Sequence, residues 1–281
     1  MKKLGTSFFI FFSLFGSIDL GKTPQRAKFV QQEVFTVSLK ERYRLNNRTF
    51  HVVLEAPEIS YTPGSVIAIY PESSSETFRP RHRYYSIASS LKATPGEIHL
   101  TVVTFTKEKD GHKTPGLCSN FLCKEAKIGQ KINCFIPSKK KFSPPKSPDS
   151  PVIMISSGAG IAPFRGFMQE RSQTPSKNWL IHGGRTYKDD FYYQEEWERL
   201  IASDHLKVTT AFSRDQDEKI YVQHRMHEHA EEIRKWIDEG AVVYICGNSK
   251  QMVKDVTKTL EEILGSKEQV DSLRKAGRLF P

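Results

Sequence analysis

The sequence predicts two domains, an antiparallel β-barrel followed by an α/β domain with a doubly wound parallel sheet. Three observations support this fold class. Short β-rich segments separated by turn residues fill the first half, a stretch rich in proline and lysine follows, and strand-like segments then alternate with helical ones. With 281 residues and 38% hydrophobic content, the chain is long enough to build two cores of ordinary composition.

The first 27 residues form a leader that differs from the rest of the chain. Two lysines follow Met1, and residues 4–15 are mainly apolar, as in a secretory signal. The apolar run is too short and too interrupted for a membrane span, and no small-residue cleavage site follows it. We expect residues 1–27 to be disordered or targeting-like and the protein to be cytoplasmic, with membrane association through the leader as the alternative.

Residues 28–145 are predicted to form the barrel. Its candidate strands are rich in β-branched or aromatic residues and cover 34–39, 50–54, 66–70, 85–88, 98–105 and 131–136. Proline and glycine pairs at 63–64 and 95–96 mark turns between them. Short strands with such turns are typical of a small antiparallel barrel. Residues 138–151 carry too much proline and charge to pack, so the domain boundary is expected inside them.

Residues 146–281 are predicted to form the α/β domain. Candidate strands at 152–155, 179–182, 207–212 and 242–246 alternate with candidate helices at 163–171, 194–201, 222–238 and 250–264. This alternation predicts a parallel sheet, in which ligands bind beyond the carboxyl ends of the strands. Gly158, Gly160 and Cys246 all fall at such ends.

Charge and cysteine content limit the partners. The excess of 42 Lys and Arg over 32 Asp and Glu gives a net charge of +10, which favours an acidic partner. The cations are scattered or lie in the linker without interleaved aromatic residues, which argues against nucleic-acid binding. The four cysteines lack the spacing of a zinc site or an iron–sulfur cluster, and reduced thiols are expected. Of His224, His227 and His229, only the first two share a helix face, so we expect no metal site there.

The segment after the strand at 152–155 has the composition of a phosphate-binding turn. Small residues from 156 to 160 interrupt the apolar run, and Pro163 suits the first turn of a helix. Such a turn lets phosphates approach backbone N–H groups at the positive end of a helix. An ordinary strand-to-helix turn would have the same local sequence.

Two segments of the barrel half also suit a dinucleotide. In a strand, Arg83 and Tyr85 share one face, where a guanidinium could bind a pyrophosphate and the phenol could stack on a flat ring. Ser86 follows them directly. An amphipathic strand with a surface arginine is the alternative. Gly116 and Ser119 begin a second small-residue turn, which fits either a phosphate or a simple N-cap.

A further segment follows the strand at 207–212. Ser213, Arg214, Lys219 and Tyr221 combine a hydroxyl, two cations and a phenol, which suits a phosphate monoester beside a flat base. A solvated loop of mixed charge is the alternative.

Together and in this order, these motifs resemble the ferredoxin–NADP reductase superfamily. The resemblance rests on residues 83–90, 116–122, 158–163, 213–221 and 244–247, and it covers about 28–280. The second half is most similar to the FAD/NADPH-binding half of the sulfite reductase (NADPH) flavoprotein component and related diflavin reductases. The first half is compact between Pro71 and Arg83, without a connecting insertion, and is more similar to a plant-type ferredoxin–NADP reductase.

The resemblance implies an FAD enzyme that accepts hydride from NADPH and passes electrons to a separate, acidic protein, such as a flavodoxin, a ferredoxin or a haemoprotein subunit. A sulfite reductase flavoprotein component in sulfur assimilation is the alternative, and a relative that binds FAD without turnover is less favoured. The implied roles are hydride transfer for Ser86 and Cys246; FAD binding for Arg83, Tyr85, Ser86, Gly116, Cys118 and Ser119; nicotinamide binding for Gly158, Ala159, Gly160 and Pro163; and 2′-phosphate and adenine binding for Ser213, Arg214, Lys219 and Tyr221.

Three positions depart from the pattern of this superfamily. Ala159 stands where threonine is usual, and Asn248 where the diflavin enzymes carry aspartate. The sequence ends at Phe280 and Pro281, before the terminal aromatic that covers the flavin in relatives, so Phe280 is the candidate for that place. Without such a cover, we expect weaker NADPH selectivity or leakage of electrons to oxygen.

Overall fold

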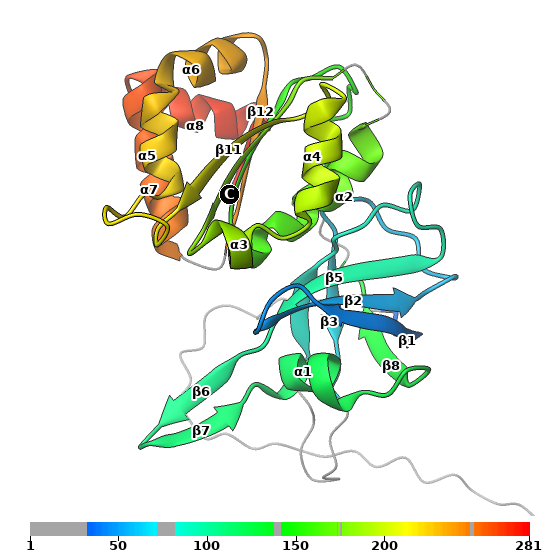
Figure 1. Ribbon diagram of the computed structural model, residues 1–281. Helices are drawn as coiled ribbons and strands as arrows, with labels where there is room; N and C mark the ends of the chain where they lie inside the picture. The colour runs from blue at the N-terminus through cyan, green and yellow to red at the C-terminus, as the bar shows by residue number, and fades with distance from the viewer. Residues whose placement is uncertain (1–32, 72–81, 138–141, 173, 175, 248–249) are drawn as a thin grey trace, which may run out of the picture. The chain divides into compact units, whose positions relative to one another are not determined.

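The structure is a computed structural model that describes residues 33–71, 82–137, 142–172, 174, 176–247 and 250–281 (Figure 1). Gln32–Pro281 form one compact unit. Its described residues form a six-stranded sheet, a five-stranded sheet and a two-stranded hairpin. The predicted leader, residues 1–27, and the lysine run of the predicted linker lie outside the described residues.

The first sheet forms the barrel region, and its neighbouring strands are antiparallel. The strand order is β4-β3-β8-β1-β2-β5. A bridge between Ile87, just after β4, and Leu100 in β5 joins the two edges and closes the barrel. The strands are β1 (Phe35–Arg44), β2 (Thr49–Glu55), β3 (Val66–Ile69), β4 (Arg83–Ser86), β5 (Glu97–Val103) and β8 (Lys131–Phe135).

Alternate side chains of these strands fill the barrel. Val37, Leu39, Val52 and Leu54 are buried on β1 and β2 and belong to one apolar cluster, as the two-residue period of a strand requires. The outer side chains of β2 are buried as well. His51 is one of them, because the parallel-sheet region covers that face of the barrel, where Tyr193 contacts its ring nitrogen at 2.9 Å.

An exposed hairpin was not predicted. It consists of β6 (Thr106–Lys109) and β7 (His112–Pro115), which pair antiparallel and project from the barrel region (Figure 1). Asp110 and Gly111 form its two-residue turn, with φ of 52° and 76°. The predicted helical turn follows as α1 (Leu117–Asn120) and continues as a π-helical turn at Phe121–Glu125.

The second sheet is parallel throughout, in the order β11-β10-β9-β12-β13. Its strands are β9 (Val152–Ser157), β10 (Asn178–Gly184), β11 (Lys207–Phe212), β12 (Val242–Cys246) and β13 (Leu279–Phe280). The central strand β9 is buried from residue 152 to 156, which explains its uninterrupted apolar sequence. Strand β13 was not predicted.

Helices cover both faces of this sheet (Figure 1). On one side lie α2 (Ala162–Arg171), α3 (Tyr187–Asp190) and α4 (Gln194–Ala202); on the other lie α5 (Val222–Glu228), α6 (Ala230–Asp238), α7 (Lys250–Leu264) and α8 (Lys267–Lys275). The prediction of one helix at 222–238 is wrong. His229 leaves helical geometry, with φ −109° and ψ 25°, and its ring contacts Trp179.

These sheets confirm the predicted fold class, an antiparallel barrel followed by a doubly wound α/β region. The division at residues 145 and 146 stays a prediction. Within the ranges that the structure describes, no helix has the length and apolar content needed to cross a bilayer.

Candidate functional site

The end of β9 lies at the point where the strand order of the parallel sheet reverses. From β9, the chain's strands run outward to β10 and β11 on one side and to β12 and β13 on the other. In open α/β sheets, a crevice forms at this switch point, beyond the carboxyl ends of the strands. The predicted glycine turn begins there, directly after Ser157.

Two different constraints require glycine in this turn. Gly158 has φ +52°, a conformation that costs an L residue about 1 kcal/mol or more. Gly160 touches the end of β12: a Cβ atom on it would lie 2.1 Å from the carbonyl oxygen of Cys246 and 2.6 Å from its carbonyl carbon. Gly158–Ile161 form a 3₁₀ turn that leads into α2, with Pro163 at the start of that helix. The turn therefore packs directly against Cys246.

A pocket of about 510 Å³ opens beside the turn, within the size range of small-molecule sites. Most of its lining comes from the ends of β9, β10 and β11 and from the starts of α5 and α7, and two residues come from the barrel. The lining residues are Arg48, Val103, Ser157, Gly158, Ala159, Gly183, Gly184, Arg185, Asp190, Tyr192, Ala211, Tyr221, Val222, Gln223, Gln251, Met252 and Asp255.

Two cations in this lining were not predicted. Arg185 follows β10, and its backbone N–H donates to the carboxylate of Asp190 at 2.8 Å. Its position just after a strand was a usable signal, because the predicted Ser213 and Arg214 follow their strand in the same way. Arg48 comes from the β1–β2 turn of the barrel, and nothing in its local sequence points to the pocket.

The predicted 2′-phosphate segment begins beside the same strand end. The backbone N–H of Ser213 donates to the carbonyl oxygen of Gly184 at 3.1 Å, and that of Arg214 donates to the carbonyl of Arg185 at 2.8 Å. Arg214 and Lys219 are exposed. Of the four predicted residues, Tyr221 alone lines the pocket, at the N-cap of α5, and the other three lie on the loop that leads to it.

In the barrel, the structure brings the two predicted FAD segments together. Burial raises the pKa of the Tyr85 phenol, and the nearby Cys118 thiol, which is hydrogen-bonded to it, adds to this effect. Burial also raises the pKa of Cys118 to about 11, against smaller opposing effects of Tyr85 and the positive charge of Arg83. Arg83, Tyr85 and Cys118 thus share one neighbourhood, with Arg83 exposed.

The Ser119 hydroxyl stabilises its own turn. It accepts a hydrogen bond from the backbone N–H of Phe105 at 3.2 Å and donates to the carbonyl oxygen of Gly116 at 3.3 Å. A Cβ atom on Gly116 would lie 2.9 Å from this hydroxyl, so the turn is as tight as the sequence suggested. For Ser119 to donate to a phosphate, its bond to Gly116 would have to be exchanged.

Ser86 and Cys246 meet where the barrel and the parallel sheet approach each other. Burial raises the pKa of the Cys246 thiol to about 11, and a hydrogen bond with the Ser86 side chain opposes that rise. The thiol is therefore protonated at neutral pH. Because Gly160 packs on the carbonyl of Cys246, the predicted hydride-transfer pair and the glycine turn converge at one point.

Phe280 lies in β13, and its ring stacks on Tyr244 with centroids 5.1 Å apart and 12° between the planes. Tyr244 is 1% exposed and also contacts Phe167 of α2, so it belongs to the core beneath that helix. This contact gives no support to Phe280 as a cover for a flavin. Asn248 lies outside the described residues.

The residues present fit two dinucleotides. At the parallel sheet, the glycine turn packs so tightly that a Cβ atom on Gly160 would clash with backbone, and the pocket beside it is lined by arginines. Both features suit a phosphorylated nucleotide. In the barrel, a half-buried phenol, an exposed guanidinium and a tight turn at a helix start suit a second one.

Comparison with known proteins agrees with this geometry. Residues 154–258 match the family model of the oxidoreductase NAD-binding domain, and residues 79–121 match that of the FAD binding domain. The chain is 44% identical over 185 residues to the sulfite reductase [NADPH] flavoprotein alpha-component of Bacillus subtilis, which covers 65% of this chain and 31% of that protein.

Two further relatives carry the same name. The protein of Photobacterium profundum is 43% identical over 208 residues, which are 70% of this chain and 34% of that protein. The protein of Escherichia coli O157:H7 is 41% identical over 185 residues, which are 65% of this chain and 31% of that protein. The chain spans about a third of the length of these curated relatives. The barrel, the doubly wound sheet and both domain matches confirm the predicted resemblance to the ferredoxin–NADP reductase superfamily.

Proposed function

We propose that this protein is an NADPH-dependent flavoprotein reductase that passes electrons to a separate protein. The contact of Ser86 with Cys246 beside Gly160 carries this proposal. It lies between the proposed FAD segment and the proposed nicotinamide segment, and a hydride transfer requires such proximity.

FAD would supply the redox chemistry by accepting a hydride, two electrons with one proton, from the nicotinamide, which is oxidised as the flavin is reduced. The chain's own residues would bind and orient the two rings. We propose that Tyr85 stacks on the isoalloxazine, that Arg83 pairs with the FAD pyrophosphate, and that Gly116, Cys118 and Ser119 flank that pyrophosphate. Ser86 and the protonated thiol of Cys246 would contact the reacting edges of the two rings.

We further propose which residues hold the second cofactor. Gly158, Ala159, Gly160 and Pro163 would accept the nicotinamide half. Ser213, Arg214, Lys219 and Tyr221 would hold the 2′-phosphate and adenine. Each hydrogen bond to a charged phosphate is worth roughly 1.5–3 kcal/mol, so two of them give on the order of 10²–10⁴ preference for NADPH over NADH.

The acceptor is proposed to be a separate protein. The curated relatives are named as flavoprotein components of sulfite reductase, which favours a haemoprotein subunit in sulfur assimilation as the acceptor. A flavodoxin or ferredoxin is the other candidate. The net charge of +10 suits an acidic surface in either case. In this proposal, residues 28–145 act as the FAD-binding domain and residues 146–281 as the NADP-binding domain.

Steady-state reduction of ferricyanide by the FAD-loaded protein tests this function. Arg214→Ala and Lys219→Ala should each raise KM for NADPH by about 10-fold or more and change KM for NADH less than about threefold, since one charged hydrogen bond is lost. Lys275→Ala changes an exposed lysine of α8; it is the matched control and should change neither. Equal effects on both nucleotides would refute the phosphate assignment, and no turnover with either would refute the proposed function.

A further inference from the structure

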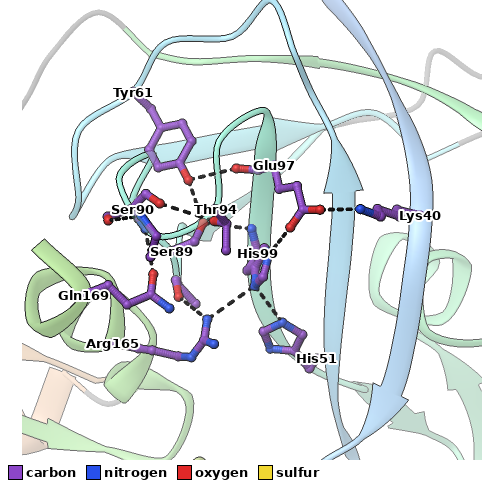
Figure 2. A network of polar contacts seen from close by, with 12 residues as sticks. Lys40, His51, Tyr61, Ser89, Ser90, Thr94, Glu97, His99, Arg165 and Gln169 are labelled. Carbon is purple, nitrogen blue, oxygen red and sulfur yellow. Dashed lines mark hydrogen bonds and ion pairs between the residues drawn. The ribbon is translucent and has the colours of Figure 1, made fainter. Parts of the chain in front are cut away.

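Arg165 is a buried arginine of α2, with 8% of its surface exposed, and it bonds in two directions. Toward its own region, Nε and Nη2 each donate to the carboxylate of Glu196 in α4 at 2.8 Å. Toward the barrel, Nη1 donates to the carbonyl oxygen of Ala88 at 2.8 Å and lies 3.3 Å from Nδ1 of His99 (Figure 2). One guanidinium thus joins the parallel-sheet region to the barrel.

The segments that Arg165 joins are those of the proposed reaction. Helix α2 directly continues the glycine turn at Gly158–Ile161. Ala88 stands two residues after Ser86 in the sequence. A shift of α2 relative to Ala88 would therefore move the nicotinamide turn relative to the end of the flavin strand.

Two more contacts hold α2 against the same barrel segment. The next residue, Gly166, passes so close to Ser89 that a Cβ atom on it would lie 2.7 Å from the Ser89 carbonyl oxygen. One turn later, the side-chain oxygen of Gln169 accepts a hydrogen bond from the backbone N–H of Ser90 at 2.8 Å (Figure 2). Three successive barrel residues, 88–90, thus each contact a residue of α2. These contacts fix both the position of α2 along the barrel segment and its distance from that segment.

In the hydrogen-bond network around Arg165, each bond has one donor and one acceptor group. His99 Nδ1 faces Arg165 and, at 3.0 Å, Nε2 of His51, so it is the acceptor of both. Nε2 of His99 then donates to Glu97 at 2.8 Å. The Tyr193 ring lies under the Arg165 guanidinium, with 4.8 Å between the ring centre and Cζ of Arg165. Tyr193 holds this place although its backbone φ of +64° is unfavourable for a residue with a side chain. A buried polar network of this kind contributes more to holding the surrounding segments in one arrangement than to the net free energy of unfolding.

We propose that Arg165 is a positioning residue for hydride transfer, holding the nicotinamide turn in register with Ser86 through the carbonyl of Ala88. The inference rests on the proposed function. Arginine suits the task because its planar fork bonds Glu196 and Ala88 at once, whereas a lysine ammonium on a flexible stem is a single point charge. A residue needed only for stability would affect folding and leave the rate of the bound complex unchanged.

The test compares Arg165→Lys with Arg171→Lys. Arg171 is the matched control because it is a buried arginine of the same helix whose bonds, to Asn178 and to the carbonyl of Ser150, stay near its own sheet. Stopped-flow absorbance would give the rate of flavin reduction and the Kd for NADPH. Arg165→Lys should slow reduction by about 10–100-fold with a Kd within about threefold, since a shift of about 1 Å costs up to about 100-fold in rate. Arg171→Lys should stay within about threefold in both.

Hydrogen exchange in the cofactor-free protein gives a second readout. Arg165→Lys should speed exchange at the amide of Ser90, which is bonded to α2, and Arg171→Lys should not. A second variant, Gln169→Met, keeps the inference testable if Arg165→Lys does not fold. It removes the bond to Ser90, leaves the ion pair of Arg165 with Glu196 intact, and should slow flavin reduction by about 3–10-fold. Wild-type rates in both Arg165→Lys and Gln169→Met would overturn the inference. If NADPH does not reduce the flavin of the wild type, the proposed function fails. Unchanged exchange at the Ser90 amide in Arg165→Lys would independently overturn the inference that Arg165 holds the register.

Discussion

Lowering the pH from 7.5 to 5 should destabilise this protein through histidines that are buried in the neutral form. Burial lowers the pKa of His51 to about 2, with the positive charge of Arg165 and the neighbouring His99 acting in the same direction. Burial lowers the pKa of His182 to about 4, against the smaller effect of its bond to the carbonyl of Asp190. Since each folded-state pKa lies below the ordinary value of 6.5, the unfolded chain binds protons first.

The magnitude follows from these values. Stability is complete above pH 6.5 and is lost as the pH falls toward the folded-state pKa of each group. At pH 5, which is about 1.5 units below the unfolded value, each of His51 and His182 costs about 2 kcal/mol, at about 1.36 kcal/mol per unit. Together they remove about 4 kcal/mol from the free energy of unfolding. His99, whose pKa burial also lowers, acts in the same direction.

Urea unfolding followed by tryptophan fluorescence at pH 7.5 and pH 5 measures this loss. His51→Gln keeps hydrogen-bonding groups near Tyr193 and His99 but cannot bind the proton, so the loss should shrink by about 2 kcal/mol. His112→Gln changes an exposed histidine on β7 and is the control, which should lose as much as the wild type. An identical loss in His51→Gln and the wild type would refute the reasoning.

Two further predictions concern the cofactor sites. Gly160→Ala should destabilise the protein by about 1–3 kcal/mol and abolish tight NADPH binding, because the added methyl meets the Cys246 carbonyl; Gly158→Ala, where nothing lies within 4 Å, should cost only about 1 kcal/mol in urea unfolding. Equal costs at the two positions would contradict the steric argument. Tyr85→Ala should weaken FAD binding by about 3–10-fold in a fluorescence titration, and Tyr85→Phe should bind like the wild type because stacking requires the ring alone. Weak binding by the phenylalanine variant would instead assign the role to the hydroxyl and its contact with Cys118.

The sequence was sufficient for the architecture because the strands of both sheets carry strong hydrophobic patterns. The strand at 207–212 and the helix at 250–264 appear with the bounds that their patterns predicted. The β6–β7 hairpin escaped prediction because all its strand residues are exposed, and an exposed strand has no hydrophobic period. The break at His229 escaped for the opposite reason, since helical periodicity continues on both sides of it.

The candidate site was predictable where it depends on local sequence. The glycine turn and the end of β12 meet as the α/β pattern implied, because the carboxyl ends of parallel strands share one edge. Arg48 in the pocket and the partners of Arg165 could not be found this way. Their contacts join residues far apart in the chain, and a buried histidine such as His51 or His99 carries no local signal of its partner.

Anaerobic stopped-flow absorbance of the FAD-loaded protein tests the proposed hydride transfer most directly. The protein is mixed with NADPH, with NADPH deuterated at the transferring position, and with NADH. NADPH should bleach the flavin band in a fast phase, the deuterated nucleotide should slow this phase, and NADH should give a much slower one. A flavin that stays oxidised in the presence of NADPH would contradict the proposed convergence of Ser86, Cys246 and Gly160 on one hydride transfer. Equal rates with NADPH and NADH would contradict the assignment of Arg214 and Lys219 to the 2′-phosphate.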